Sequence, residues 1–193
     1  EGRIIPMHTM CDQILRKLYR DNKYEGRNAV QTVISMHMYP DYWLNEKIIW
    51  TPLATREAYN LTEYVSFREL TDETGNFKFI NDYNTALRKT EAQQSETQKK
   101  LIKLGEKYQV LMEVINWNFM KIIPLKGDKA HTWYMPFNQE LMMKDSVSSR
   151  VALTYISSLN DEAKSNGNFA KSTKLLNDLK KVQRTLGDAS ILP

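Results

Sequence analysis

Three histidines are the side chains in this sequence best suited to binding a metal or haem iron. None of them lies at a metal-binding spacing from another histidine, a cysteine or a carboxylate. His131 follows a turn and precedes Trp133 and Tyr134, which predicts an accessible position and makes it the best single ligand candidate; an ordinary loop histidine is the competing interpretation. His37 lies on an apolar helical stripe, which favours a buried core histidine. His8 lies near a predicted helix N-terminus, where the helix dipole disfavours its charged form.

The sulfur-containing residues and the common catalytic motifs point to no reaction. Cys11 is the one cysteine and lies on an apolar stripe, which indicates a buried, inert thiol and leaves no intrachain disulfide or cysteine-based zinc site. The nine methionines lack the repeated spacing of a copper-binding tract, so core packing explains them better. The sequence has no Cys-x-x-Cys-His, no Gly-x-Ser-x-Gly and no glycine-rich phosphate loop. We therefore predict that the chain is not an enzyme, and no cofactor is firmly implied.

These candidates are positioned by a helical chain whose centre is the stretch Leu101 to Pro124. Its apolar residues recur at steps of three and four along one helical face, formed by Leu101, Leu104, Tyr108, Leu111, Ile115 and Phe119. The run from Ser95 to Gln98 predicts a capping box, so the helix would extend over about 25 residues, roughly 38 Å, until Pro124 ends it. Four charged residues fall off the stripe and are predicted to face solvent: Lys100, Lys103, Lys107 and Glu113.

Shorter elements flank this helix. Hydrophobic periodicity and turn residues predict further helices near residues 8–21, 28–39, 41–45, 51–60 and 82–89, and short strands near 47–50 and 63–67. In the last third, Asp145 or Ser146 caps a helix with an apolar stripe of Val147, Val151, Tyr155 and Leu159. A second helix runs from about Asn168 to Leu186, and the short connection makes the two an antiparallel hairpin. The predicted fold class is mainly α with a few short β-strands, built around one long central helix and a C-terminal antiparallel helix hairpin.

Length and composition set the outer limits. A chain of 193 residues is one domain or two tight subdomains, and its weakest joint is predicted near residues 135–144. The net charge of +4 is mildly basic without a lysine-arginine run, so we predict no nucleic-acid partner. No stretch approaches the ~20 apolar residues of a membrane span. A start without Met and an abrupt apolar ending suggest a fragment excised from a longer chain.

Several stretches, taken in order, resemble one protein family. The opening Gly2-Arg3-Ile4-Ile5-Pro6-Met7-His8-Thr9, followed by Ile14-Leu15-Arg16-Lys17, resembles the entry to the extracytoplasmic region of ResB/CcsA-type (system II) cytochrome c biogenesis proteins, in the fused form of Bacteroidetes-like bacteria. Three later parts of the sequence resemble further motifs of that family: Asp72–Lys78, the long helix, and the run from Gly127-Asp128 to Trp133-Tyr134-Met135-Pro136. The closing Ile191-Leu192-Pro193 resembles the point before the next membrane span. Gly105 and Met135 depart from the pattern, which has an acidic residue and a serine there.

The resemblance implies that residues 1–193 form a single soluble extracytoplasmic domain of a larger membrane protein, on the periplasmic side of the bacterial inner membrane. The whole protein would move haem across the membrane and promote its attachment to apocytochrome c. The family's tryptophan-rich haem-handling motif is not in this sequence, so the segment would be a non-catalytic accessory domain that positions apocytochrome c or shapes the haem exit side. Its partners would be apocytochrome c and the membrane portion of the same polypeptide, and haem would enter through that parent protein.

The resemblance also assigns roles to individual residues. Arg3 would donate to an ion pair, Pro6 would break the chain before the first helix, and Thr9 would cap that helix. Arg3 and Thr9, together with Trp133 and Tyr134, form the candidate docking edge. Two alternatives stay open: a haem-contacting domain that uses His131, and a stand-alone helical protein-interaction domain unrelated to haem.

Overall fold

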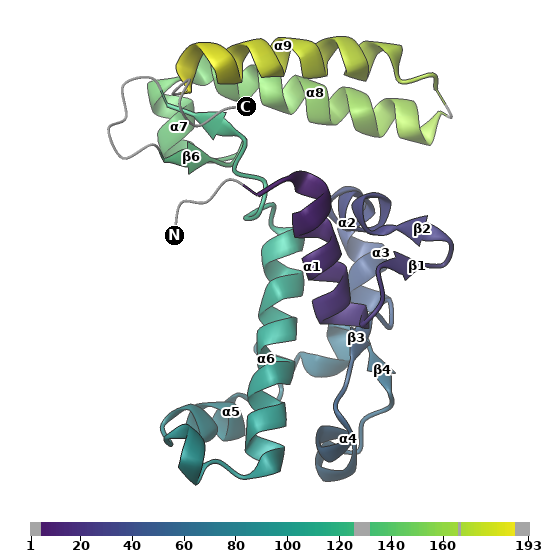
Figure 1. The fold of residues 1–193 in the computed structure, drawn as a ribbon, viewed down its shortest axis with the longest axis vertical. Coiled ribbons are helices and arrows are strands. Elements are labelled where there is room, and N and C mark those ends of the chain that lie inside the picture. The colour runs from purple at the N-terminus through teal and green to yellow at the C-terminus, as the bar shows by residue number, and fades with distance from the viewer. Residues whose placement is uncertain (1–4, 126–131, 166, 188–193) are drawn as a thin grey trace. The chain divides into compact units, whose positions relative to one another are not determined.

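The computed structural model describes residues 5–125, 132–165 and 167–187. Within them the chain is mainly helical with a few short antiparallel strand pairs and a C-terminal helix pair, which confirms the predicted fold class (Figure 1). The residues form two compact units, which we call the N-terminal unit (Ile5–Asn116) and the C-terminal unit (the described residues from Trp117 onward). The sequence predicted the weakest joint near residues 135–144. The boundary between the two units lies upstream of that stretch, between Asn116 and Trp117. Whether the chain is one domain of a larger polypeptide stays a prediction.

The N-terminal unit is built around the long helix α6, Glu96–Ile115. Ser95 and Gln98 form the predicted capping box, in which each side chain accepts a hydrogen bond from the other residue's backbone N–H. The stripe residues Leu101, Leu104, Tyr108 and Leu111 are buried as predicted. They pack against four other helices that surround α6 (Figure 1): α1 (Met7–Tyr19), α2 (Ala29–Met38), α4 (Leu53–Tyr59) and α5 (Ile80–Leu87).

The helix α6 is shorter than the sequence predicted. It ends at Ile115, and Asn116 is its C-cap, whereas we predicted that it would continue to Pro124. The backbone of Trp117 is in the left-handed region with φ 63°, a conformation that a right-handed helix cannot contain. Phe119 therefore lies in a turn, and Pro124 belongs to strand β5 (Ile123–Pro124).

A close helix contact fixes α5 against α6. Gly105 is buried in α6, and a Cβ atom built there would overlap the ring of Tyr83 on α5. Glycine in a helix interior costs about 1 kcal/mol relative to alanine, so its presence here has a steric reason. The position at which the family pattern has an acidic residue is thus a packing position in this chain.

Short strands and turns connect the helices of the N-terminal unit. Strands β1 (Lys23–Tyr24) and β2 (Arg27–Asn28) form a hairpin through Glu25 and Gly26, which both have positive φ. The carboxamide of Asn28 then caps α2 by accepting from Gln31 N–H at 2.9 Å. After α3 (Pro40–Asn45), β3 (Ile49–Trp50) pairs antiparallel with β4 (Tyr64–Val65). Two single turns of 3-10 helix follow, Arg68–Leu70 and Glu91–Gln93.

The C-terminal unit contains a helix hairpin and a two-stranded ribbon. Strand β5 pairs antiparallel with β6 (Trp133–Tyr134), and α7 (Gln139–Lys144) leads into the hairpin of α8 (Ser146–Lys164) and α9 (Ala170–Leu186). The predicted cap is present: Asp145 accepts from Ser148 N–H at 3.0 Å. The core of the unit comprises Ile123, Leu141, Ala152 and Leu179.

The inward face of α8 agrees only in part with the predicted stripe: Val151 and Tyr155 pack against the core of the unit, but Val147 does not. Val147 is 68% exposed, while Ser148, Ser149 and Ala152 are buried. The hydroxyl of Ser149 donates a 2.7 Å hydrogen bond to the carbonyl of Pro136, which satisfies its polarity inside the unit. Small side chains on this face allow α8 and its neighbours to approach closely.

Candidate functional site

Two of the predicted site residues, Arg3 and His131, lie outside the described residues, so their roles stay predictions. Thr9 is described, and its predicted role as a cap is wrong. It is the third residue of α1, whose N-cap is Pro6 without a side-chain hydrogen bond. Pro6 therefore marks the start of the helix as predicted, and its fixed φ, rather than a hydroxyl, shapes the entry.

Trp133 and Tyr134 form strand β6 and are both half-buried. Tyr134 pairs with Ile123, its carbonyl accepts a 3.1 Å hydrogen bond from Ile122 N–H, and its side chain packs against the core of the C-terminal unit. These contacts give both residues a structural task in the ribbon. The docking edge that was predicted to include them stays a prediction.

The two remaining chemical candidates are buried. Cys11 is fully buried, and desolvation, with a smaller contribution from Asp12, raises the pKa of its thiol to about 11, which fits the predicted inert thiol. His37 is 4% exposed, and burial lowers its pKa to about 4, partly offset by a hydrogen bond with the backbone of Val114. It is thus a neutral core histidine at physiological pH, as the sequence favoured. No group of His, Cys, Asp and Glu side chains in the described part of the chain is arranged to hold a metal ion.

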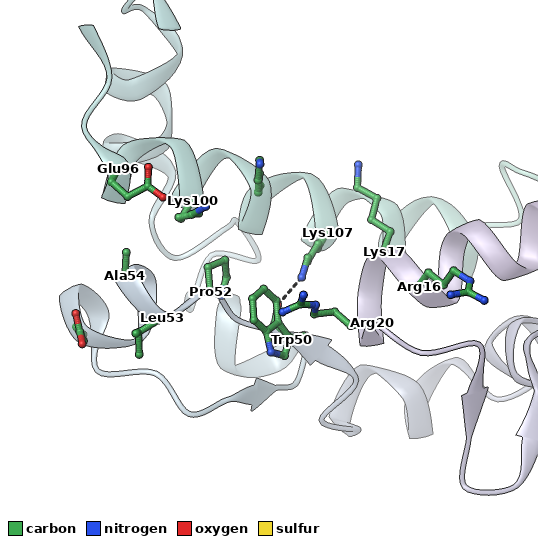
Figure 2. Close-up of a pocket in the computed structure, with 12 residues that line it drawn as sticks. Arg16, Lys17, Arg20, Trp50, Pro52, Leu53, Ala54, Glu96, Lys100 and Lys107 are labelled. Atoms are coloured by element: carbon green, nitrogen blue, oxygen red, sulfur yellow. Dashed lines mark hydrogen bonds and ion pairs between the residues drawn. The ribbon is translucent and has the colours of Figure 1, made fainter. Parts of the chain in front are cut away.

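A cleft of about 670 Å³ lies in the N-terminal unit, between α1, α6 and the segment that opens α4 (Figure 2). This volume lies in the range of ligand sites, roughly 300–1,000 Å³. Six cationic side chains line the cleft: Arg16, Lys17 and Arg20 from α1, and Lys100, Lys103 and Lys107 from α6. Two carboxylates, Glu57 and Glu96, also line it, so the lining carries an excess of positive charge. We call this feature the cationic cleft.

Trp50 lies at the centre of the cationic cleft, where three positive side chains converge on it. The guanidinium carbon of Arg20 lies 4.1 Å from the centroid of the indole ring, and that of Arg56 lies 5.6 Å from it. The amine of Lys107 lies 4.5 Å from the same centroid (Figure 2). Cations at these distances are attracted by the negative face of the ring, with roughly 0.5–2 kcal/mol for each pair.

Lys107 is the least exposed of these cations. It is 7% exposed, and its amine donates a 2.6 Å hydrogen bond to the carbonyl of Trp50. Desolvation, together with smaller contributions from the positive charges of Arg20 and Lys17, lowers the pKa of its amine to about 8. The prediction that this side chain faces solvent is therefore wrong. Its amine is held inside the cluster by contacts with a residue from a distant part of the chain.

Only part of the positive charge is neutralised within the protein. Lys17 pairs with Glu106 at 2.9 Å, and Lys100 pairs with Glu96 at 2.9 Å. These pairs are exposed and contribute about 0–1 kcal/mol each, so a ligand could displace them at little cost. Among the described residues, Arg16 and Lys103 have no carboxylate within ion-pair distance.

An arrangement of this kind can bind an anionic ligand. The opposite wall of the cleft is mainly apolar, formed by Pro52, Leu53 and Ala54 with Leu53 63% exposed, and Glu57 lies one helical turn beyond Leu53 on α4 (Figure 2). Sequence reasoning missed the site because its cations come from two helices that are far apart in the chain. One signal was available: Lys107 follows Leu104 by three residues and precedes Leu111 by four, so it lies on the flank of the buried stripe.

Comparison with known proteins gives one informative relationship. No family model matches the chain. Over 135 residues, it is 24% identical to Protein NrfI of Wolinella succinogenes. The matched region covers 68% of this chain and 15% of NrfI, so the chain corresponds to a small part of that protein. In the described residues, no helix has the length and apolar character required to cross a bilayer.

Proposed function

We propose that this chain is a non-catalytic domain of a cytochrome c assembly protein, located on the periplasmic side of the bacterial inner membrane. In this proposal it supports haem delivery and attachment by positioning apocytochrome c or by shaping the haem exit side. The similarity to NrfI carries the proposal, because it supports a link to cytochrome c biogenesis at a coarse level. The ordered motifs from Arg3 to Pro136 supply the finer assignment.

The geometry of the N-terminal unit agrees with a binding role. The cationic cleft combines exposed positive side chains with an apolar wall, which is the composition of a surface that holds a partner. The pKa of Lys107 is lowered to about 8, but its amine is buried and hydrogen-bonded to the Trp50 carbonyl. Its position favours a structural role over proton transfer to a ligand.

A direct binding experiment tests the proposal. The purified chain is immobilised, and apocytochrome c and its holo form are passed over it at matched concentrations. We expect saturable binding of the apo form and at least roughly tenfold weaker binding of the holo form, since a positioning domain must release the finished product. Absence of apocytochrome binding would refute the positioning role.

A haem titration followed by absorbance distinguishes the haem-contacting alternative. Saturable binding that is lost in His131→Ala would place this domain on the haem path and make His131 its ligand. In that case apocytochrome positioning would no longer be the preferred function. The stand-alone alternative is tested separately, by whether the parent gene encodes membrane spans on both sides of this segment.

A further inference from the structure

We propose that the cationic cleft of the N-terminal unit binds an acidic peptide segment, whose carboxylates pair with the lysines and arginines of α1 and α6 while an apolar side chain rests on Leu53 and Pro52. This inference about the cleft rests on the proposed function in one respect. It names the chemistry of the partner segment that a positioning domain would recognise. The closing experiments separate the failure of one from the failure of the other.

The positive charges of α6 form a row along the cleft. Lys100, Lys103 and Lys107 are separated by three and four residues, so they follow one face of the helix at intervals of about 5–6 Å. In an extended peptide, every second side chain points to the same side at a spacing of roughly 7 Å. Lys107 closes the row, because its buried amine is already bonded to the Trp50 carbonyl, so carboxylates at alternate positions of such a peptide would meet the amines of Lys100 and Lys103.

This spacing favours a peptide over a single phosphate group. A phosphate site concentrates its donors on one anion, commonly with backbone N–H groups at a helix start or in a glycine-rich loop. In the cationic cleft the long side chains are instead spread along two helices (Figure 2). The element that opens at the cleft, α4, has only seven residues and begins at Leu53. Several separated charges match a linear polyanion better than one compact anion.

The aromatic residue of the cleft distinguishes a peptide from a single-stranded nucleic acid. Proteins that bind single strands stack the bases on exposed aromatic rings. Here Arg20 and Lys107 lie over the ring of Trp50, within 4.1 Å and 4.5 Å of its centroid, at the distance that a stacked base would need. Trp50 therefore holds the cations in place, and the exposed apolar surface next to them is aliphatic. Leu53, which is 63% exposed, suits an apolar side chain of a peptide.

Fluorescence anisotropy of a labelled peptide tests the proposal. The probe is a 12-residue peptide made of three repeats of Glu-Ser-Glu-Leu, and its control has Gln in place of every Glu. We expect the acidic peptide to bind with an affinity that falls as salt is added, and the Gln peptide to bind at least roughly tenfold more weakly. Equal binding of the two peptides would overturn the proposal.

Charge reversal locates the site. Arg16→Glu combined with Lys103→Glu removes two exposed cations that have no carboxylate partner among the described residues, so the fold should persist, and circular dichroism checks this. We expect roughly tenfold weaker binding of the acidic peptide. Lys78→Glu combined with Arg88→Glu is the matched control, because it reverses the same two residue types at exposed positions of the same unit that do not line the cleft. An equal loss in the control would indicate a nonspecific charge effect and overturn the assignment to the cleft.

A second variant tests the apolar wall without altering charge. The Leu53→Ser substitution should weaken binding of the Glu-Ser-Glu-Leu peptide several-fold. It should not change the binding of a second peptide in which every Leu is replaced by Ser. Other anion sources are compared directly. Tighter binding of inorganic polyphosphate, or of vesicles containing phosphatidylglycerol, at the same cleft would overturn the choice of a peptide as ligand.

The results also separate this inference from the proposed function. If apocytochrome c binds the double charge-reversal variant as well as the unmodified chain, the cleft is not its docking site and only the inference fails. If the acidic peptide binds at the cleft and apocytochrome c does not bind the chain, the inference stands and the positioning role fails.

Discussion

The amine of Lys107 donates a 2.6 Å hydrogen bond to the carbonyl of Trp50 and also lies 4.5 Å from the centroid of the Trp50 ring. One lysine on α6 thereby contacts both the backbone and the side chain of β3. The contact joins the central helix to the short β3–β4 ribbon, and Arg20 of α1 lies over the same ring at 4.1 Å. The residues that give the cleft its charge thus also hold the N-terminal unit together.

The buried amine predicts an unusual dependence of stability on pH. The pKa of Lys107 falls from 10.5 to about 8 on folding, so the unfolded chain binds the proton more tightly between these values. The free energy of unfolding should therefore rise by about 2 kcal/mol between about pH 7 and pH 9.5. Urea denaturation at the two pH values measures this. In Lys107→Met the rise should disappear, and an unchanged rise in the variant would contradict the assignment.

The denaturation series must stop below pH 10, because above that value the tyrosines lower the free energy of unfolding as the pH rises, whereas Lys107 raises it. Desolvation and a hydrogen bond to Asp82 raise the pKa of Tyr59 to about 12, and burial also raises the pKa of Tyr24. A raised tyrosine pKa contributes stability that is lost as the pH increases above the ordinary value near 10. Above that value the two effects would partly cancel.

The neutral core histidine predicts a loss of stability in acid. The pKa of His37 falls from 6.5 to about 4 on folding, so the unfolded chain gains the proton first as the pH is lowered. The free energy of unfolding should decrease by about 2 kcal/mol between pH 7 and pH 4.5 because of this group. His37→Leu should retain that stability over the same interval when both proteins are compared by thermal denaturation. Parallel curves for the two proteins would show that His37 does not cause the loss.

The contact between α5 and α6 predicts that an added methyl group is destabilising. In Gly105→Ala, the new Cβ would overlap the ring of Tyr83 and displace α5. Overpacking costs about 1–3 kcal/mol, and the better helix propensity of alanine recovers up to about 1 kcal/mol, so a net loss of about 1–2 kcal/mol is expected. Chemical denaturation measures this. The combination with Tyr83→Leu should recover part of the loss, and an increase in stability in the single variant would exclude the steric explanation.

The capping box of α6 predicts a smaller effect. Ser95→Ala removes the acceptor for Gln98 N–H, which the hydroxyl accepts at 3.2 Å. The expected loss is about 1 kcal/mol in the free energy of unfolding, and Ser95→Asp should restore it because aspartate is an equally good N-cap. Hydrogen exchange of the first-turn amides of α6 provides a local readout. Unaltered exchange in the alanine variant would mean that the cap is not formed in solution.

Local patterns predicted the elements that depend on nearby residues. Three such features are present: the period of the α6 stripe, the capping box at Ser95 and the cap at Asp145. Each involves positions within one or two helical turns. The end of α6 was not predictable from such patterns. Trp117 adopts a left-handed conformation, in which a bulky aromatic residue is rare, and nothing in its type signals the helix stop.

The candidate site was beyond prediction for a different reason. The burial of Lys107 depends on Trp50, which is 57 residues away in the sequence, and a helical stripe contains no information about that neighbour. The same limitation explains why the α8 stripe was predicted only in part: Ser149 is buried with its hydroxyl donating to the Pro136 carbonyl, a partner that the sequence does not identify. Hydrophobic periodicity finds apolar faces, but it cannot find polar residues that are buried because a partner satisfies them.

The assembly of the cationic cleft from distant segments has a consequence for biosynthesis. Its walls come from α1, the start of α4 and α6, and Lys17 and Glu106, which form one of its ion pairs, are 89 residues apart. A growing polypeptide therefore exposes α1 and α4 long before α6 leaves the ribosome, and no nascent intermediate contains a complete cleft. Ligand capture at this surface would begin only after the whole N-terminal unit has been synthesised and has folded, so a truncated product could not compete for the partner.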